Sequence, residues 1–178
     1  NGKVIGEEKV KVDPLETIKP LSGSFSGVSA PTQLSAKFLV PYAAGELKAI
    51  GLINGKEVVT QVLKTAGKPN KLVLTPDRNR IKADRNDLAY VTVEVADENE
   101  NVIPNANLSY EVEIAGNGEL AATGNACPNQ MESFQDNKSK LFHGKAVVIV
   151  RPFDKKGKIT LSVKNSTVKQ ATVEITVK

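Results

Sequence analysis

Two pairs of acidic residues are spaced closely enough to act together. Asp84 and Asp87 are three positions apart, and Glu98 and Glu100 are two positions apart. Two carboxyl groups can divide the roles of acid and nucleophile when their surroundings raise the pKa of one of them. The first pair lies among three arginines, which favours charge pairing and a turn, and the second lies in a run typical of a solvated hairpin tip. Neither pair is accompanied by a recognisable base, orienting residue or pocket, so we predict no catalytic residue in this chain.

Metal and thiol chemistry find little support in the sequence. His143 is the only histidine and has no Cys, His or carboxylate cluster at ligand spacing, which argues against zinc. The acidic run at 97–100 could suggest calcium, but it lacks the glycine and the ligand order of a known calcium loop. Cys127 is the single cysteine, so it forms no internal disulfide, and no activating base is visible near it. We expect neither a metal nor a cofactor.

A long irregular segment, 124–143, is the most plausible contact surface, because loops on a rigid scaffold tend to carry function. Its polar and aromatic candidates for contact with a sugar or with another domain are Asn125, Asn129, Glu132, Phe134 and His143. The chain has no tryptophan, which weakens a sugar-binding role. A local core formed by Met131 and Phe134 is the interpretation we favour over sugar contact. Contact with other domains of a larger protein is an equally open alternative.

The scaffold for this loop is predicted to be a β-sandwich. In the stretch 88–97, LAYVTVEVAD, Ala89, Val91, Val93 and Val95 alternate with Tyr90 and polar residues, as on a strand with one buried face. Seven further segments after Pro69 have strand character with turn residues between them, and no helical period occurs. The eight predicted strands cover 71–75, 80–83, 88–96, 108–114, 119–123, 144–151, 158–164 and 170–177.

The first part of the chain has fewer clear signals. We predict a weak strand at 4–12, a loop at 13–33 with a short strand around Phe25, and a strand at 34–42. The segment 45–63 is predicted to be a hairpin, because Asn54-Gly55 is the favoured pair for a type I′ turn. One face of this hairpin, with Leu47, Ala49, Val58 and Val62, is expected to enter a core. The other face carries Ile50, Leu52, Val59 and Leu63, and therefore predicts a second apolar contact.

A polar stretch at 65–70 is predicted to separate two domains, 1–68 and 69–178. The composition, with 40% hydrophobic and 25% charged residues, is ordinary for a globular protein. The net charge of +4 is spread along the chain without a dense basic window, so nucleic acid is not an expected partner. No apolar run of membrane-spanning length and no signal peptide is present, and no membrane partner is expected.

Several segments, in order along the chain, resemble one known family. They are NGK at 1–3, VPYAAGELKAIG at 40–51, LKTAGKP at 63–69, DLAYVTVEVADENENVIPNA at 87–106, GNACPNQMESF at 124–134 and GKAVVIVRP at 144–152. In this order they are similar to the C-terminal end of β-galactosidase-like enzymes of glycoside hydrolase family 2. The run that begins with LTPDR at 74 also resembles the opening of invasin-type immunoglobulin-like domains.

The resemblance implies two immunoglobulin-like β-sandwich modules in tandem, the first truncated at its N-terminus. It places catalysis in an upstream (β/α)8 barrel, which becomes the expected partner of this chain. The expected function is that of a non-catalytic accessory region, which packs on the enzyme body or extends its substrate surface. The alternatives are a carbohydrate-binding module and an invasin-type adhesin or cell-surface spacer. A truncated first module further predicts a homodimer through that module, and the family implies a periplasmic or secreted bacterial protein.

Overall fold

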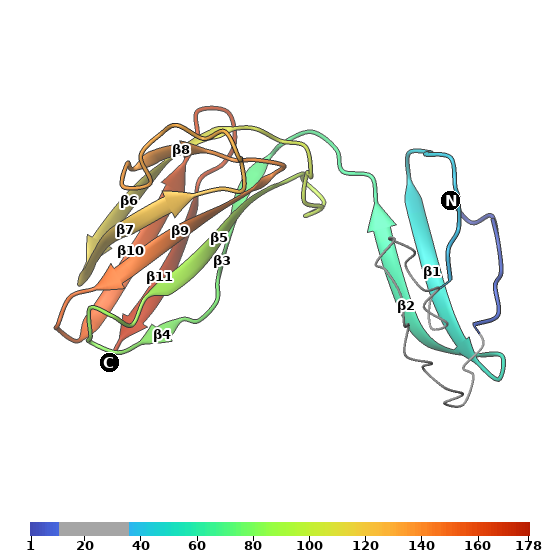
Figure 1. Cartoon of the computed structure of the whole chain (residues 1–178), viewed down its shortest axis with the longest axis horizontal. Helices are drawn as coiled ribbons and strands as arrows, with labels where there is room; N and C mark the ends of the chain where they lie inside the picture. The colour runs from blue at the N-terminus through green and yellow to red at the C-terminus, as the bar shows by residue number, and fades with distance from the viewer. Residues whose placement is uncertain (11–35) are drawn as a thin grey trace, which may run out of the picture. The chain divides into compact units, whose positions relative to one another are not determined.

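The computed structural model describes residues 1–10 and 36–178, which form two compact units, Asn1–Leu63 and Lys64–Lys178 (Figure 1). The short strand predicted around Phe25 lies outside the described residues, as do positions 11–12 and 34–35 of two other predicted strands. No helix occurs in the described parts of the chain, so the prediction of an all-β protein is confirmed. The domain division at 68/69 stays a prediction.

The described residues of the first unit form one two-stranded hairpin, made of β1 (Glu46–Ile53) and β2 (Lys56–Lys64). The two residues between these strands have positive φ angles, 52° at Asn54 and 76° at Gly55. These are the backbone angles that a type I′ turn requires, so the predicted Asn-Gly turn is confirmed.

Two strands predicted before this hairpin are wrong over their described residues. Residues 4–10 and 36–42 are not in strands. Alternating residue types favour an extended chain, but a strand also needs a partner that accepts its backbone hydrogen bonds. The N-terminal segment is instead held through Asn1, whose side-chain oxygen accepts the Glu46 amide at 2.9 Å and whose side-chain amide donates to the Ala44 carbonyl at 3.0 Å.

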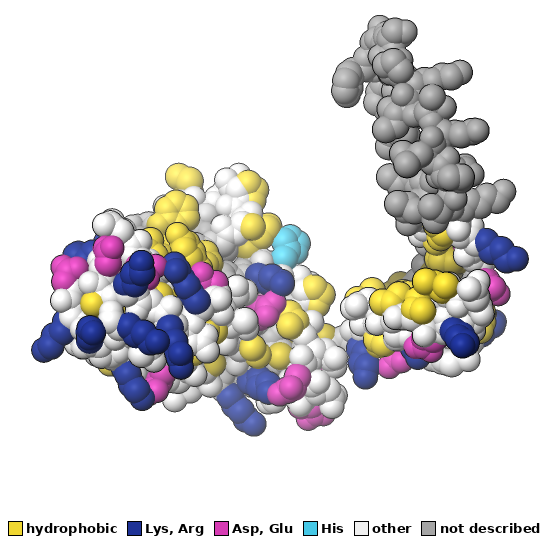
Figure 2. Space-filling model, turned by 90° about the horizontal axis from the view of Figure 1, so that it is seen from below, with side chains coloured by type: hydrophobic (Ala, Val, Ile, Leu, Met, Phe, Trp, Pro, Cys, Tyr) yellow, Lys and Arg dark blue, Asp and Glu magenta, His cyan; other side chains and the backbone are white. Residues whose placement is uncertain are grey.

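The predicted core face of the hairpin is also wrong. Leu47 is 46% exposed and Val58 is 57% exposed, and among the described residues of this unit only Gly51 and Val62 are partly buried. Apolar side chains of the opposite face, such as Leu52 and Val59, are exposed as well, and hydrophobic side chains cover much of this unit in Figure 2. A two-stranded hairpin has no second layer of its own, so alternation alone cannot bury either face.

The second unit, Lys64–Lys178, holds nine strands in two sheets (Figure 1). The four-stranded sheet has the order β3-β5-β9-β7 and the five-stranded sheet has the order β4-β11-β10-β6-β8. All pairs are antiparallel except β4 with β11. The bounds are β3 Lys71–Pro76, β4 Arg80–Ile81, β5 Ala89–Ala96, β6 Ser109–Gly116, β7 Gly118–Gly124, β8 Lys138–Lys140, β9 Lys145–Pro152, β10 Gly157–Lys164 and β11 Ala171–Val177. Each of the eight segments predicted after Pro69 forms a strand, and only β8 was missed.

The core lies between these two sheets. Val91, Val93 and Val95 of β5 are 0% exposed, as the alternation in this strand predicted. They pack in one cluster with residues of the facing sheet, including Leu161 of β10 and Ile175 of β11. Two sheets that are antiparallel apart from the β4–β11 pair, with inward residues at every second position, form a β-sandwich of immunoglobulin type.

Candidate functional site

The Asp84–Asp87 pair forms a turn rather than a catalytic dyad. The Asp87 amide donates to the Asp84 carbonyl at 2.9 Å, and the Asp84 carboxylate accepts the Asn86 amide at 2.9 Å. The Asp87 carboxylate accepts the Lys82 amide at 2.6 Å and pairs with Arg78 at 2.9 Å. The hydrogen bond from Lys82, together with the nearby Arg78 charge, lowers the pKa of Asp87. A carboxyl group with a lowered pKa is ionised at neutral pH and is a poor proton donor.

The acidic run after β5 also has a structural use. Asp97 is buried, and its carboxylate accepts the amides of Gly67 at 2.7 Å, Asn99 at 2.9 Å and Asn101 at 2.9 Å. The hydrogen bond from the Gly67 amide first, then one from the Asn101 side-chain amide at 3.1 Å and those from the other two backbone amides, lower the pKa of Asp97 to about 2. Glu100 pairs with Lys71 at 2.6 Å, which lowers the pKa of Glu100. Among residues 1–10 and 36–178, no group of three or more His, Cys, Asp or Glu side chains is arranged to hold a metal ion.

The segment 124–143 is tied down at several points and contains the missed strand β8. Asn125 spans the loop, since its side-chain oxygen accepts the Cys127 amide at 2.8 Å and its side-chain amide donates to the Lys140 carbonyl at 2.8 Å. The Thr123 amide donates to the Phe134 carbonyl at 2.6 Å. Asn125 is thus a structural residue, whereas Asn129 is exposed at the loop surface.

The favoured local core beneath this loop is wrong for both of its residues. Met131 is 95% exposed and Phe134 is 57% exposed. The ring of Phe134 lies beside Gly124. A Cβ atom placed on Gly124 would be 3.6 Å from Cδ1 of Phe134 and 3.7 Å from Cγ1 of Val147. The aromatic ring therefore lies on the surface of the four-stranded sheet, next to Gly124 and Val147.

His143 belongs to a tight hairpin turn and is exposed (Figure 2). It has φ 50° and Gly144 has φ 76°, while Phe142 and Lys145 on either side exchange two backbone hydrogen bonds at 2.9 and 3.1 Å. The imidazole stacks edge-on against Phe142, with 4.3 Å between the ring centroids. Its position is therefore set by a type I′ turn between Phe142 and Lys145.

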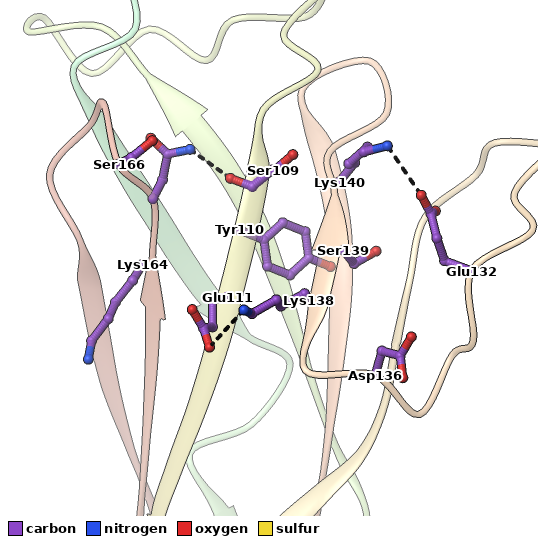
Figure 3. A pocket seen from close by; sticks show the side chains of 11 residues that line it. Ser109, Tyr110, Glu111, Glu132, Asp136, Lys138, Ser139, Lys140, Lys164 and Ser166 are labelled. Carbon is purple, nitrogen blue, oxygen red and sulfur yellow. Dashed lines mark hydrogen bonds and ion pairs between the residues drawn. The ribbon is translucent and has the colours of Figure 1, made fainter.

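An open polar groove of about 630 Å³ lies next to the loop (Figure 3). It is lined by Ser109, Tyr110, Glu111, Glu132, Asp136, Lys138, Ser139, Lys140, Lys164, Asn165 and Ser166. Ion pairs join Lys140 to Glu132 at 3.2 Å and Lys138 to Glu111 at 3.8 Å. Of the five loop residues singled out from the sequence, only Glu132 lines this groove. The groove residues of β6 and of the end of β10 were missed because they are distant from the loop in sequence and meet it only through the sheet. Those at 136–140 lie within the loop segment itself, in and just before the unpredicted strand β8.

Two buried polar side-chain atoms lie near Ser139, one of the residues that line the groove. Within residues 1–10 and 36–178, the hydroxyl of Tyr110 and the side-chain oxygen of Gln130 have no hydrogen-bond partner of ordinary geometry. Gln130 donates to the Ser139 hydroxyl at 3.5 Å, and Ser139 is the direct cross-strand neighbour of Tyr110. Burial raises the pKa of Tyr110, an effect that the neighbouring Ser139 hydroxyl opposes.

Both parts of the chain match known protein families. Residues 72–174 match the family described as glycoside hydrolase family 2 C-terminal domain 5, and residues 1–59 match a domain of unknown function (DUF4982). A β-galactosidase of Bacteroides ovatus is 39% identical over 142 residues, which are 80% of this chain and 17% of that protein. A β-galactosidase of Thermoanaerobacter pseudethanolicus is 39% identical over 119 residues, which are 67% of this chain and 14% of that protein.

A solved structure agrees with these relatives. A glycosyl hydrolase family 2 member from Bacteroides cellulosilyticus is 35% identical, with a TM-score of 0.74, over 81% of this chain and 20% of its own. The chain thus spans a fifth or less of the length of each of these three proteins. No helix among the described residues is long and apolar enough to cross a membrane. The match over 72–174 covers more than half of the 178 residues, and the chain therefore belongs to the glycoside hydrolase family 2 C-terminal domain 5 family.

Proposed function

We propose that this chain is a non-catalytic accessory region of a β-galactosidase-like glycoside hydrolase. The observation that carries the proposal is its match to small parts of two bacterial β-galactosidases, 17% and 14% of their lengths. Its acidic residues support it as well. The Asp84–Asp87 pair is used in a turn, and the pKa of Asp97 is held at about 2 by hydrogen bonds. The pKa values of Asp87 and Asp97 are lowered, whereas a general acid needs a raised pKa.

The role within the enzyme is proposed to be structural, by packing on the catalytic body, and the catalytic barrel is the proposed partner. The sandwich core is complete within the second unit, which suits a rigid module attached to a larger enzyme. The test is to compare thermal stability and turnover of the full-length enzyme with and without residues 64–178. Loss of stability without a change in the KM for a small aryl galactoside supports packing. An unchanged melting temperature would contradict it.

A second candidate is contact with carbohydrate through the polar groove. The groove offers three carboxylates and three lysines, from Glu111, Glu132, Asp136, Lys138, Lys140 and Lys164, which can accept and donate hydrogen bonds to sugar hydroxyls. Affinity electrophoresis in galactan, comparing the chain with its Glu132→Ala variant, tests this role. Retardation that disappears in the variant would favour a substrate-binding extension over packing.

We further propose that the first unit mediates homodimerisation, because its hairpin exposes apolar side chains on both faces.

A periplasmic or secreted location is proposed from the family resemblance and the bacterial relatives. Fractionation of cells that express the full-length enzyme tests the location, and recovery in the cytoplasmic fraction would contradict it.

A further inference from the structure

We infer that the outer face of the four-stranded sheet is a docking surface for an apolar protein surface of the same enzyme, contributed by its upstream region. This inference rests on the proposed function, since it assumes that the chain is joined to a catalytic body. The docking face is defined by Tyr90, Val147, Ile149 and Phe134. It does not include the polar groove described above.

Strand register places the first three of these residues side by side. Tyr90 of β5 is the cross-strand partner of Ile149 in β9, and Ile149 is also paired with Ala122 of β7. Thr92 is paired with Val147 in the next row. Because Val91, Val93, Val148 and Val150 point inward and are 0% exposed, the residues that alternate with them point outward. Tyr90 is 45% exposed, so its ring is available to a partner.

Phe134 adds a second aromatic ring to the same face from a different part of the chain. Val147 is paired with Gly124 of β7, and the ring of Phe134 lies against that glycine. The hydrogen bond from the Thr123 amide to the Phe134 carbonyl, at 2.6 Å, fixes the loop backbone at this point. A phenylalanine that is 57% exposed is thus held over the sheet rather than left on a free loop tip.

The outer face of the other sheet is different in kind. Its central strands β10 and β11 present Thr160, Ser162, Thr172, Glu174 and Thr176, which are ordinary residues for a solvated sheet. Ser162 and Thr172 share a hydrogen bond at 3.0 Å, and Lys158 pairs with Glu174 at 2.9 Å. The two outer faces of the sandwich therefore differ: the central strands β10 and β11 of one sheet present polar side chains, and the other sheet carries aromatic and branched aliphatic side chains. An antiparallel sheet with one solvated face needs no such residues there.

Paired charges border the docking face at both ends. Lys145 binds Glu94 at 2.8 Å at one end, and Glu119 is shared by Arg85 at 2.6 Å and Arg151 at 3.7 Å at the other. An apolar centre with aromatic residues inside a polar rim is the usual anatomy of a protein interface. Because the rim charges already have partners within the chain, they call for an uncharged surface rather than for an anion or a nucleic acid.

The related enzymes indicate where that surface comes from, because the matched family is a C-terminal domain and both β-galactosidase relatives are much longer than the matched segment. In both β-galactosidase relatives the matched segment is less than a fifth of one continuous polypeptide. Covalent linkage gives a neighbouring domain a high effective concentration, so a small apolar patch is enough to hold it. Interfaces between domains of one chain are accordingly modest, roughly 600–1,500 Å².

Cysteine labelling can test the docking face directly. Tyr90→Cys places a thiol on the docking face, and Thr172→Cys places a matched thiol on the outer face of the opposite sheet. Both variants are made in the 178-residue chain and in the full-length enzyme, and the rate of alkylation of each site is followed by mass spectrometry of its peptide. We expect both sites to react readily in the 178-residue chain. In the full-length enzyme the Tyr90→Cys site should react slower by about tenfold or more, whereas the Thr172→Cys site should be unchanged.

Equal rates at the Tyr90→Cys site in the two proteins would overturn the inference. So would protection that appears in the 178-residue chain as its concentration rises, which would assign the face to a second copy, or protection that requires added galactan. Hydrolysis of an aryl β-galactoside by the full-length enzyme is measured in parallel. Protection at Tyr90→Cys in a protein without glycosidase activity would sustain the docking face while contradicting the proposed function.

Discussion

The carboxylate of Asp97 accepts a hydrogen bond from the amide of Gly67 at 2.7 Å, across 30 positions of sequence. Gly67 lies before the first strand of the sandwich, and Asp97 lies directly after β5. The same carboxylate caps the turn that follows by accepting the amides of Asn99 and Asn101. One buried acid therefore attaches the entry of the chain to the sandwich and shapes a turn at the same time.

Asp97→Asn should lower the melting temperature by several degrees, because an amide cannot accept all of these hydrogen bonds. The pH dependence has a defined sign. The pKa of Asp97 is about 2 in the folded protein against 3.8 for the free group, so its stabilising effect is present above pH 3.8 and is lost as the pH falls towards 2. Thermal melts between pH 2 and 7 should show a smaller acid loss for Asp97→Asn than for the unaltered chain. An identical acid profile would show that this carboxylate does not stabilise the fold.

Val93→Asp should prevent folding of the sandwich, while Thr92→Asp should be mild. Val93 is 0% exposed between the sheets, and an unpaired charge buried there costs at least about 3 kcal/mol of the free energy of unfolding. Thr92 is its neighbour on the outer face and remains partly exposed. Circular dichroism and urea unfolding of both variants provide the comparison. Equal damage from the two substitutions would contradict the observed direction of these side chains.

Tyr110→Phe should be tolerated despite the burial of this residue. Its hydroxyl has no hydrogen-bond partner of ordinary geometry in the described part of the chain, so its removal should change the free energy of unfolding by less than about 1 kcal/mol. Burial raises the pKa of Tyr110 from 10.0, so the unaltered chain should lose stability as the pH rises above 10, and the variant should lose less. Urea unfolding at pH 7 and pH 11 measures both effects. A large loss in Tyr110→Phe at pH 7 would mean that the hydroxyl is bonded, for instance to a buried water.

The exposed hairpin predicts self-association of the whole chain. Leu52 is 54% exposed and Val59 is 62% exposed, and such a surface tends to recruit a second copy. Light scattering should show a dimer that dissociates in a Leu52→Lys variant but persists in Thr172→Lys, which adds the same charge at an exposed polar position of the second unit. A chain that is monomeric at all concentrations would contradict the proposed homodimer.

The sandwich could be predicted from the sequence because its strands are encoded locally. In β5, Val91, Val93 and Val95 alternate with polar or aromatic residues, and the observed burial follows that pattern. The turn at Asn54-Gly55 was equally predictable, since few residue pairs accept two positive φ angles. Strand β8 was missed because three residues, Lys-Ser-Lys, are too short for a period to be seen.

The surfaces could not be predicted in the same way, because they depend on pairing between distant segments. The position of Phe134 over Gly124 and Val147 follows from strand register and one backbone hydrogen bond, and neither leaves a mark on the local sequence. The prediction that one face of the hairpin enters a core was wrong for a related reason. The apolar face with Leu47 and Val58 was read correctly as apolar, but burial requires a second layer, which the hairpin does not contain.

The central claim is that this chain serves a glycoside hydrolase without performing the reaction itself. The most direct measurement is the hydrolysis of an aryl β-galactoside by the purified 178-residue chain and by the full-length enzyme at equal molar concentration. We expect turnover by the full-length enzyme and none above background by the chain. Turnover by the chain that survives rigorous purification and disappears in Glu132→Ala or Asp84→Ala would contradict it.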